Sequence, residues 1–273
     1  MTQALNMVLA QLSPRLRRTV DNVETMVGTI EERPGADLVL FPELFMSGYT
    51  TVGVEELAVD PGGPEVGRVA QAAKDNSTAV VFGAPERFGG GYANSAIYID
   101  RNGTVAGIYR KASLFGSERE AYVPGDELLV VDLGGSKAGL MICFDVEFPE
   151  VARALAQAGA DLLLTISANM DPFGRDHHVF GTSRALENGL PYAYVNQVGT
   201  GEEFTFVGGT MAVSADGDIL VETGNTAEEV LEFELELPAR SSVRPDYLSQ
   251  LRSPFPTTRD ASAVGHQPRR ADR

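Results

Sequence analysis

The only cysteine in the chain, Cys143, is the residue best suited to nucleophilic chemistry. It follows an apolar run with strand character, and Pro149 and Glu150 open a segment with helical spacing, residues 151–158. A strand-to-helix turn can expose a thiol at a sheet edge, where backbone N–H groups and the helix dipole favour a thiolate and a developing oxyanion. A lone cysteine is also commonly a small buried hydrophobic residue, so this stretch alone leaves both interpretations open.

Glu43 and Lys111 also stand at strand ends, and their chemistry complements a thiol. Glu43 follows residues 36–41, a continuous apolar run typical of a strand buried on both faces. Lys111 directly follows a hairpin centred on residues 101–103. A carboxylate can take the thiol proton and later activate water, while an ammonium can stabilise a thiolate and an oxyanion. These three residues therefore form a candidate hydrolytic triad.

Histidine and metal chemistry are the alternatives to this triad. A papain-like pairing of Cys143 with His177 or His178 is possible, although we expect both histidines on a helix surface. Three histidines and one cysteine show no metal-ligand spacing, so we expect no metal and no other cofactor.

The elements that must position these residues alternate between strand and helix patterns. Strands are predicted at residues 5–11, 36–41, 78–83, 94–100, 104–110, 128–133, 137–143, 161–167, 192–196, 210–213, 219–222 and 230–237. Helices are predicted for a stripe formed by Leu16, Val20, Val23, Val27 and Ile30, and at residues 64–76, 151–158 and 175–188. Because hairpins are mixed with helices, a layered α/β sandwich with mixed sheets fits better than a doubly wound sheet.

Composition limits the partners and the location of the protein. The net charge of −16 opposes binding to nucleic acid and to anionic membranes. We expect a cytoplasmic protein, because no basic, apolar leader opens the chain and no run approaches the roughly 18 apolar residues of a membrane span. We expect one domain, residues 1–255, and a C-terminal tail, residues 256–273, which lacks periodicity.

The three candidate residues lie in sequence blocks that resemble those of the nitrilase superfamily, the carbon-nitrogen hydrolases. The blocks are Phe41-Pro42-Glu43-Leu44-Phe45, Tyr109-Arg110-Lys111 and Ile142-Cys143-Phe144-Asp145, and further matches extend from about Asn6 to Pro254. This resemblance implies an α-β-β-α sandwich with two mixed sheets, which usually forms a homodimer through its helical layer. We therefore expect a homodimer or a higher homo-oligomer. No other partner is expected except a small amide substrate.

The same resemblance implies the role of each residue. Cys143 would attack an amide carbonyl, Glu43 would act as general base, and Lys111 with the backbone N–H of Phe144 would form the oxyanion hole. Ammonia would leave, and water activated by Glu43 would hydrolyse the thioester. The family has a second glutamate after the lysine, and the spacing favours Glu118 over Glu120 as the residue that orients the triad.

Five more residues are candidates for the surroundings of the triad. Tyr49 is expected in the pocket wall or in packing, and Asn169 is expected to line the pocket. Asp145 is expected to cap the helix that follows Cys143. Glu187 and Arg184 are expected to form a structural pair.

The substrate is indicated by Glu147, where many related amidases have an arginine that suits a carboxylate-bearing substrate. Together with other local matches, this reversal of charge resembles bacterial amidases that act on amine-bearing amides, such as 5-aminopentanamidase. A carboxylate at the pocket could pair with a substrate ammonium. Glu147 could instead face solvent or a neighbouring arginine.

Other functions use the same triad. An N-carbamoyl amine or amino acid hydrolase is the main alternative. A nitrilase is less favoured, because true nitrilases usually have a tryptophan where Phe144 stands. A noncatalytic scaffold relative is least favoured, because the triad is intact.

Overall fold

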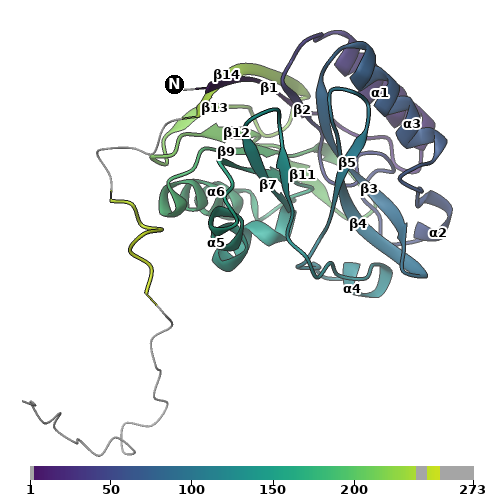
Figure 1. Cartoon of the computed structure of the whole chain (residues 1–273). Helices are drawn as coiled ribbons and strands as arrows, with labels where there is room; N and C mark the ends of the chain where they lie inside the picture. Colours follow the sequence, from purple (N-terminus) through teal and green to yellow (C-terminus); the bar gives the residue numbers. More distant parts are fainter. Residues whose placement is uncertain (1–2, 238–244, 253–273) are drawn as a thin grey trace, which may run out of the picture.

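Two six-stranded sheets lie between two layers of helices in the part of the chain that the computed structural model describes, residues 3–237 and 245–252 (Figure 1). Helices α1 and α3 cover one side, and α5 and α6 cover the other. The expected four-layer sandwich with mixed sheets is therefore confirmed. The expected tail, residues 256–273, lies outside the described residues.

The first sheet has the strand order β14-β1-β2-β3-β4-β5, and the second has the order β13-β12-β9-β8-β7-β6. In each sheet three strands are parallel neighbours: β1, β2 and β3 in the first, and β7, β8 and β9 in the second. The first sheet contains β1 (Gln3–Gln11), β2 (Leu38–Leu40), β3 (Ala79–Phe88), β4 (Gly91–Ile99), β5 (Val105–Arg110) and β14 (Glu229–Leu237). The second contains β6 (Val130–Asp132), β7 (Lys137–Ile142), β8 (Leu162–Ile166), β9 (Tyr192–Val195), β12 (Met211–Val213) and β13 (Ile219–Glu222).

The helices follow the same division into two layers. The longer ones are α1 (Thr19–Glu31), α3 (Pro64–Asp75), α5 (Pro149–Gln157) and α6 (Gly174–Asn188). Short elements are α2 (Val54–Leu57), α4 (Glu118–Ala121), the 3-10 turn η1 (Cys143–Glu147) and the strand pair β10 (Val198–Thr200) and β11 (Thr205–Val207).

The continuous apolar strands are explained by burial on both faces. In β2, Leu38 and Leu40 pack between the two sheets, while Val39 packs under the helices α1 and α3. In β8, Leu164 likewise faces the space between the sheets, and Leu163 faces α5 and α6. Because side chains alternate along a strand, a strand covered on both faces needs apolar residues at every position.

Strand β14 is covered on one face only. Leu235 and Leu237 are buried between the sheets, whereas Glu232, Glu234 and Glu236 are exposed. Because successive side chains point to opposite faces of a strand, the alternation of leucine or phenylalanine with glutamate explains why only one face is exposed to solvent.

The helix pattern was misjudged at the first helix. Helix α1 begins at Thr19, so Leu16 precedes it, and the side chain of Val20 is 71% exposed. The buried stripe consists of Val23, Met26, Val27 and Ile30. A spacing of four residues from Leu16 to Val20 matched the helical period by coincidence.

No helix among the described residues is long and apolar enough to cross a membrane.

Candidate active site

The carboxyl ends of strands from both sheets bring the candidate triad together. Glu43 follows β2 and Lys111 follows β5 in the first sheet, while Cys143 follows β7 in the second. Lys111 and Glu43 are fully buried, and Cys143 is 7% exposed. The site therefore lies at the seam between the two sheets.

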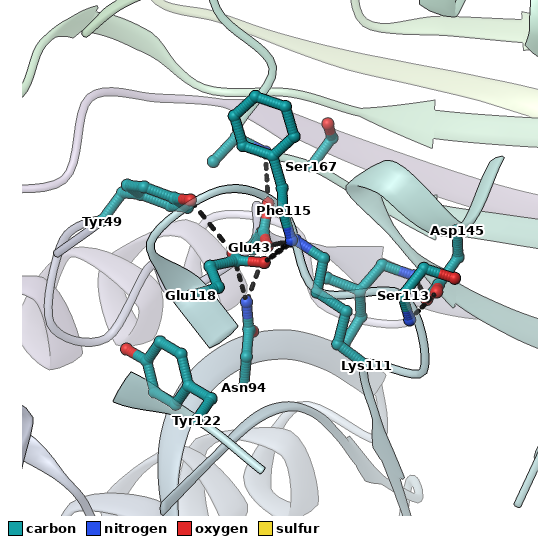
Figure 2. Close-up of polar contacts among 12 residues, drawn as sticks. Glu43, Tyr49, Asn94, Lys111, Ser113, Phe115, Glu118, Tyr122, Asp145 and Ser167 are labelled. Atoms are coloured by element: carbon teal, nitrogen blue, oxygen red, sulfur yellow. Dashed lines mark hydrogen bonds and ion pairs between the residues drawn. The ribbon is translucent and has the colours of Figure 1, made fainter. Parts of the chain in front are cut away.

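Lys111 lies between two carboxylates (Figure 2). Its Nζ donates to Glu43 Oε1 at 2.6 Å and to Glu118 Oε1 at 2.9 Å. Burial by itself lowers the pKa of Lys111, but the charges of Glu118 and Glu43 outweigh this effect and hold its pKa well above the usual value. The lysine is therefore a fixed positive charge.

Three donors hold the carboxylate of Glu43. Besides Lys111, Asn94 Nδ2 donates to Oε1 at 2.7 Å, and the backbone N–H of Ala168 donates to Oε2 at 2.8 Å. Burial raises the pKa of Glu43 to about 7, against the lowering effect of Lys111. A carboxyl with this pKa can accept and return a proton near neutral pH.

Glu118, rather than Glu120, lies against the lysine. Its carboxylate is fully buried and accepts hydrogen bonds from the Tyr49 hydroxyl at 3.0 Å and the Phe115 backbone N–H at 2.8 Å (Figure 2). Glu120 is exposed and lines a neighbouring hollow with Thr50. Glu118 is therefore fixed in place, as an orienting residue must be.

Cys143 has an unusual backbone conformation. Its φ angle of 44° lies in the left-handed region that residues other than glycine rarely adopt, and such strain is concentrated at functional sites. Cys143 begins the 3-10 turn η1, and α5 starts only at Pro149, so the thiol does not lie at the start of the α-helix as the sequence suggested.

The sequence suggested surroundings that favour a thiolate, but the surroundings of Cys143 in the structure favour the neutral thiol. Burial and the charge of Glu43 raise the pKa of Cys143, while Lys111 and hydrogen bonds from Ser167 and Ala168 lower it. A neutral thiol beside a buried carboxylate can react after proton transfer to that carboxylate.

Asp145 does not cap α5, which was the prediction. Its carboxylate accepts hydrogen bonds from the Tyr109 hydroxyl at 2.7 Å, Ser113 N at 2.8 Å and Ile142 N at 3.0 Å. Asp145 lies inside η1 and faces back toward the strand ends, because η1 separates it from the first turn of α5. It thereby links the lysine loop to the cysteine turn.

A narrow pocket opens onto the thiol and contains every residue predicted to contact substrate. Its lining consists of Tyr49, Lys111, Phe115, Cys143, Phe144, Glu147, Asn169, Met170, Phe173 and His177. The rings of Phe115, Phe144 and Phe173 pack edge to face and give one wall an apolar surface. The amide of Asn169 bonds to backbone groups of Met170 and Phe173, which fixes its orientation.

Glu147 lines this pocket, and its side chain is 29% exposed. Arg184 does not pair with the Glu147 carboxylate. Instead, the guanidinium donates to the backbone carbonyl of Glu147 at 3.0 Å and to the carboxylate of Glu187 at 2.9 Å, the structural pair that was expected. Arg184 therefore holds the η1 backbone and leaves the Glu147 side chain facing the pocket.

The prediction that His177 lies on a helix surface was wrong. His177 is 3% exposed, and its Nε2 lies 3.5 Å from Glu147 Oε1, while His178 is on the surface. The two histidines are adjacent in α6, so they point in directions about 100° apart, and only His177 faces the sandwich. Its Nδ1 is 3.0 Å from the Tyr194 hydroxyl, which does not correspond to a papain-like pair with Cys143.

Sequence reasoning missed three functional neighbours, Asn94, Ser167 and Ala168. Asn94 stands opposite Lys111 in the β4–β5 hairpin and donates to both Glu43 and Glu118. Ser167 and Ala168 follow the apolar strand β8, just before Asn169. Both lower the pKa of the Cys143 thiol, and the backbone N–H of Ala168 also donates to Glu43. A polar residue directly after a buried strand was the available signal for Ser167.

No group of three or more metal-ligating side chains capable of holding a metal ion is present in the described part of the chain.

Comparison with known proteins identifies the family. The model of the carbon-nitrogen hydrolase family matches residues 6–245. An (R)-stereoselective amidase from a Pseudomonas species is 38% identical over 245 residues, covering 88% of each chain. A probable nitrilase from Schizosaccharomyces pombe is 30% identical, covering 92% of this chain and 96% of its own.

Solved structures show the same fold. The amidase from Nesterenkonia sp. superposes with a TM-score of 0.79 and 31% identity, covering 91% of this chain and 93% of its own. A variant of that amidase carries the acetamide moiety of fluoroacetamide, added covalently at its active-site cysteine. The present chain belongs to the carbon-nitrogen hydrolase family, the nitrilase superfamily, and is a hydrolase of carbon–nitrogen bonds.

Proposed function

We propose that this hydrolase is an amidase that converts small aliphatic carboxamides with a distal ammonium group to the acid and ammonia. The observation that carries the choice of substrate is the carboxylate of Glu147 in the wall of the pocket that contains Cys143. The choice of an amide as the substrate is supported by the similarity to the (R)-stereoselective amidase and to the Nesterenkonia amidase, a variant of which was solved with butyramide.

The proposed mechanism uses the buried cluster directly. Glu43 takes the proton of Cys143 as the sulfur attacks the amide carbonyl, and Lys111 with the N–H of Phe144 stabilises the oxyanion. When the intermediate collapses, the C–N bond breaks, and the proton on Glu43 goes to the departing ammonia. Glu43 then deprotonates the water that attacks the thioester carbonyl, the C–S bond breaks, and the proton on Glu43 returns to the Cys143 sulfur. Glu118 keeps Lys111 in position throughout.

The spacing of Cys143 and Glu147 along the backbone of η1 is compatible with a short substrate chain. Glu147 follows Cys143 by four residues in a 3-10 turn, which rises about 2 Å per residue, or about 8 Å in all. The five bonds between the carbonyl carbon and the nitrogen of 5-aminopentanamide span about 6 Å, since three backbone bonds span about 3.5 Å. The aromatic wall formed by Phe115, Phe144 and Phe173 would cover the methylene groups of such a substrate.

The first test is ammonia release from 5-aminopentanamide, uncharged pentanamide and N-carbamoylputrescine, with Cys143→Ala as the inactive control. A preference for the amino amide that is lost in the control supports the proposal. Equal or better turnover of pentanamide would refute the ammonium site. Turnover of the carbamoyl compound alone would indicate an N-carbamoyl amine hydrolase.

The role of Glu147 is tested by Glu147→Gln, which removes the charge and keeps the shape. We expect kcat/KM for 5-aminopentanamide to fall about tenfold to hundredfold, which corresponds to the loss of a charged hydrogen bond of about 1.5–3 kcal/mol. The value for pentanamide should be nearly unchanged. Glu150→Gln, an exposed carboxylate of the adjacent helix, is the matched control.

A further inference from the structure

A row of buried polar side chains connects Glu147 in the pocket wall with the sulfur of Cys143 by a route that avoids Glu43 and Lys111. His177 Nδ1 lies 3.0 Å from the Tyr194 hydroxyl, and this hydroxyl donates to Ser167 Oγ at 3.0 Å. Ser167 and Cys143 directly follow Ile166 and Ile142, which are paired in the parallel strands β8 and β7, and the Ser167 side chain is one of the groups that lower the pKa of Cys143. His177, Tyr194 and Ser167 are all at least 97% buried and come from α6, β9 and the end of β8.

The hydrogen atoms of this row can be assigned from donor and acceptor counts. Tyr194 has one hydroxyl hydrogen and donates it to Ser167, so it must accept a hydrogen from His177 Nδ1. Ser167 accepts from Tyr194, which leaves its own hydrogen for the sulfur. All three hydrogens therefore point toward Cys143.

We propose that His177 is a positioning residue for the nucleophile, and that it acts through Tyr194 and Ser167 to orient the Cys143 sulfur and stabilise its thiolate. Hydrogen bonds that point in one direction polarise one another, so a donor at the far end strengthens the bond at the sulfur. The thiolate needs such donors because burial of the sulfur opposes its negative charge. This proposal holds for any amide and does not depend on the ammonium site.

The row is enclosed by side chains from several elements. His177 faces Glu147 from η1 and Tyr194 from β9, and Tyr192 stacks on Tyr194. The charged groups that act on the sulfur end are Glu43 and Lys111.

The test is the rate at which iodoacetamide alkylates Cys143, measured against pH. The chain has one cysteine, so the label reports this thiol alone. Ser167→Ala and Tyr194→Phe should move the pH midpoint of alkylation upward by about one unit, a roughly tenfold lower rate below the midpoint. His177→Leu should have the same direction of effect, since it removes the terminal donor.

Two further variants separate this role from simple packing. His177→Asn should restore the wild-type midpoint, because the side-chain amide N–H can replace the Nδ1 donor. His178→Asn, on the exposed side of the same helix, should change nothing. If Tyr194→Phe and His177→Leu lower the melting temperature but leave the alkylation midpoint at the wild-type value, the row is only structural and the proposal is wrong. The same conclusion applies if His177→Leu does not fold and Tyr194→Phe alone keeps the wild-type midpoint.

Discussion

Glu43 determines how the proposed reaction depends on pH. Burial raises the pKa of its carboxyl from 4.5 to about 7, so it is mostly protonated below that pH and cannot take the thiol proton. We therefore expect kcat/KM for an amide to rise with pH through about 7, which a profile between about pH 5 and 9 would show. A profile that is flat across neutral pH would contradict the role of Glu43 as the base.

Asn94 is expected to support the base, because its amide donates to both buried carboxylates. Asn94→Leu removes a hydrogen bond that lowers the pKa of Glu43, so the acid limb of the pH profile should move upward. The rate at neutral pH should fall about tenfold to hundredfold, the usual effect of losing a hydrogen bond to a charged group. Asn102→Ala, at an exposed turn, is the control. An unshifted acid limb in Asn94→Leu would show that the amide only fills space.

At the scale of residues, the identities of the catalytic candidates could be predicted better than the side chains that contact them. Glu43, Lys111 and Cys143 were found because each follows a recognisable strand or hairpin. Asn94 was missed because a β-bulge between Tyr98 and Ile99 shifts the register of the hairpin by one residue. Counting outward from the turn without the bulge places Ala93 opposite Lys111, and a slip of one residue moves a side chain to the other face.

The close approach of strand β3 to the Glu43 segment gives a prediction at the scale of elements. A Cβ atom on Gly83 would lie 2.6 Å from Glu43 Cα, so the two backbones touch with no room for a side chain. Gly83→Ala should displace Glu43, lower kcat by at least about hundredfold and destabilise the fold by about 1–3 kcal/mol. Both values can be measured by steady-state kinetics and thermal unfolding.

The matched control for that variant is Gly67→Ala in α3. A Cβ atom on Gly67 meets nothing within 4 Å. Alanine is the better helix former, so this change should stabilise the protein by about 0.5–1 kcal/mol and leave kcat unchanged. A similar loss of activity in both variants would show that the effect of Gly83→Ala is not local.

Elements with an apolar run or a clear period could be predicted, and several short elements with neither could not. Strands β2 and β8 and helices α3 and α6 lie within one or two residues of the predicted ranges. The elements α2, α4 and η1 and the strand pair β10 and β11 have three to five residues each, too few to show a period. Since η1 and α4 carry Glu147 and Glu118, these two candidates came from the family resemblance and not from periodicity.

The charge of the whole molecule gives a prediction for the proposed substrate. A net charge of −16 should raise the local concentration of a cation and increase kcat/KM at low ionic strength. Raising the salt concentration to about 0.5 M should therefore lower kcat/KM for 5-aminopentanamide several-fold, because screening shortens the range of the field. Pentanamide is the control and should respond weakly. An equal response of both amides would argue against electrostatic attraction.

The number of layers was the part of the fold that composition and periodicity left open. These patterns predicted a layered α/β sandwich with mixed sheets, and the resemblance of the three motif blocks supplied the four-layer arrangement. Periodicity does not reveal which strands from distant parts of the chain are neighbours. The pairing of β1 with β14 joins the two ends of the described core and is an example of such long-range order.

Because the site lies at the seam, the turnover rate depends strongly on how the two sheets are aligned. The base and the lysine belong to one sheet and the nucleophile to the other, and the Glu43–Ala168 hydrogen bond crosses the seam. A slip of about 1 Å between the sheets could reduce the rate about hundredfold while every strand stays paired. Mild heat, pressure or denaturant should therefore abolish the activity of the enzyme while its circular dichroism spectrum is still that of the native protein.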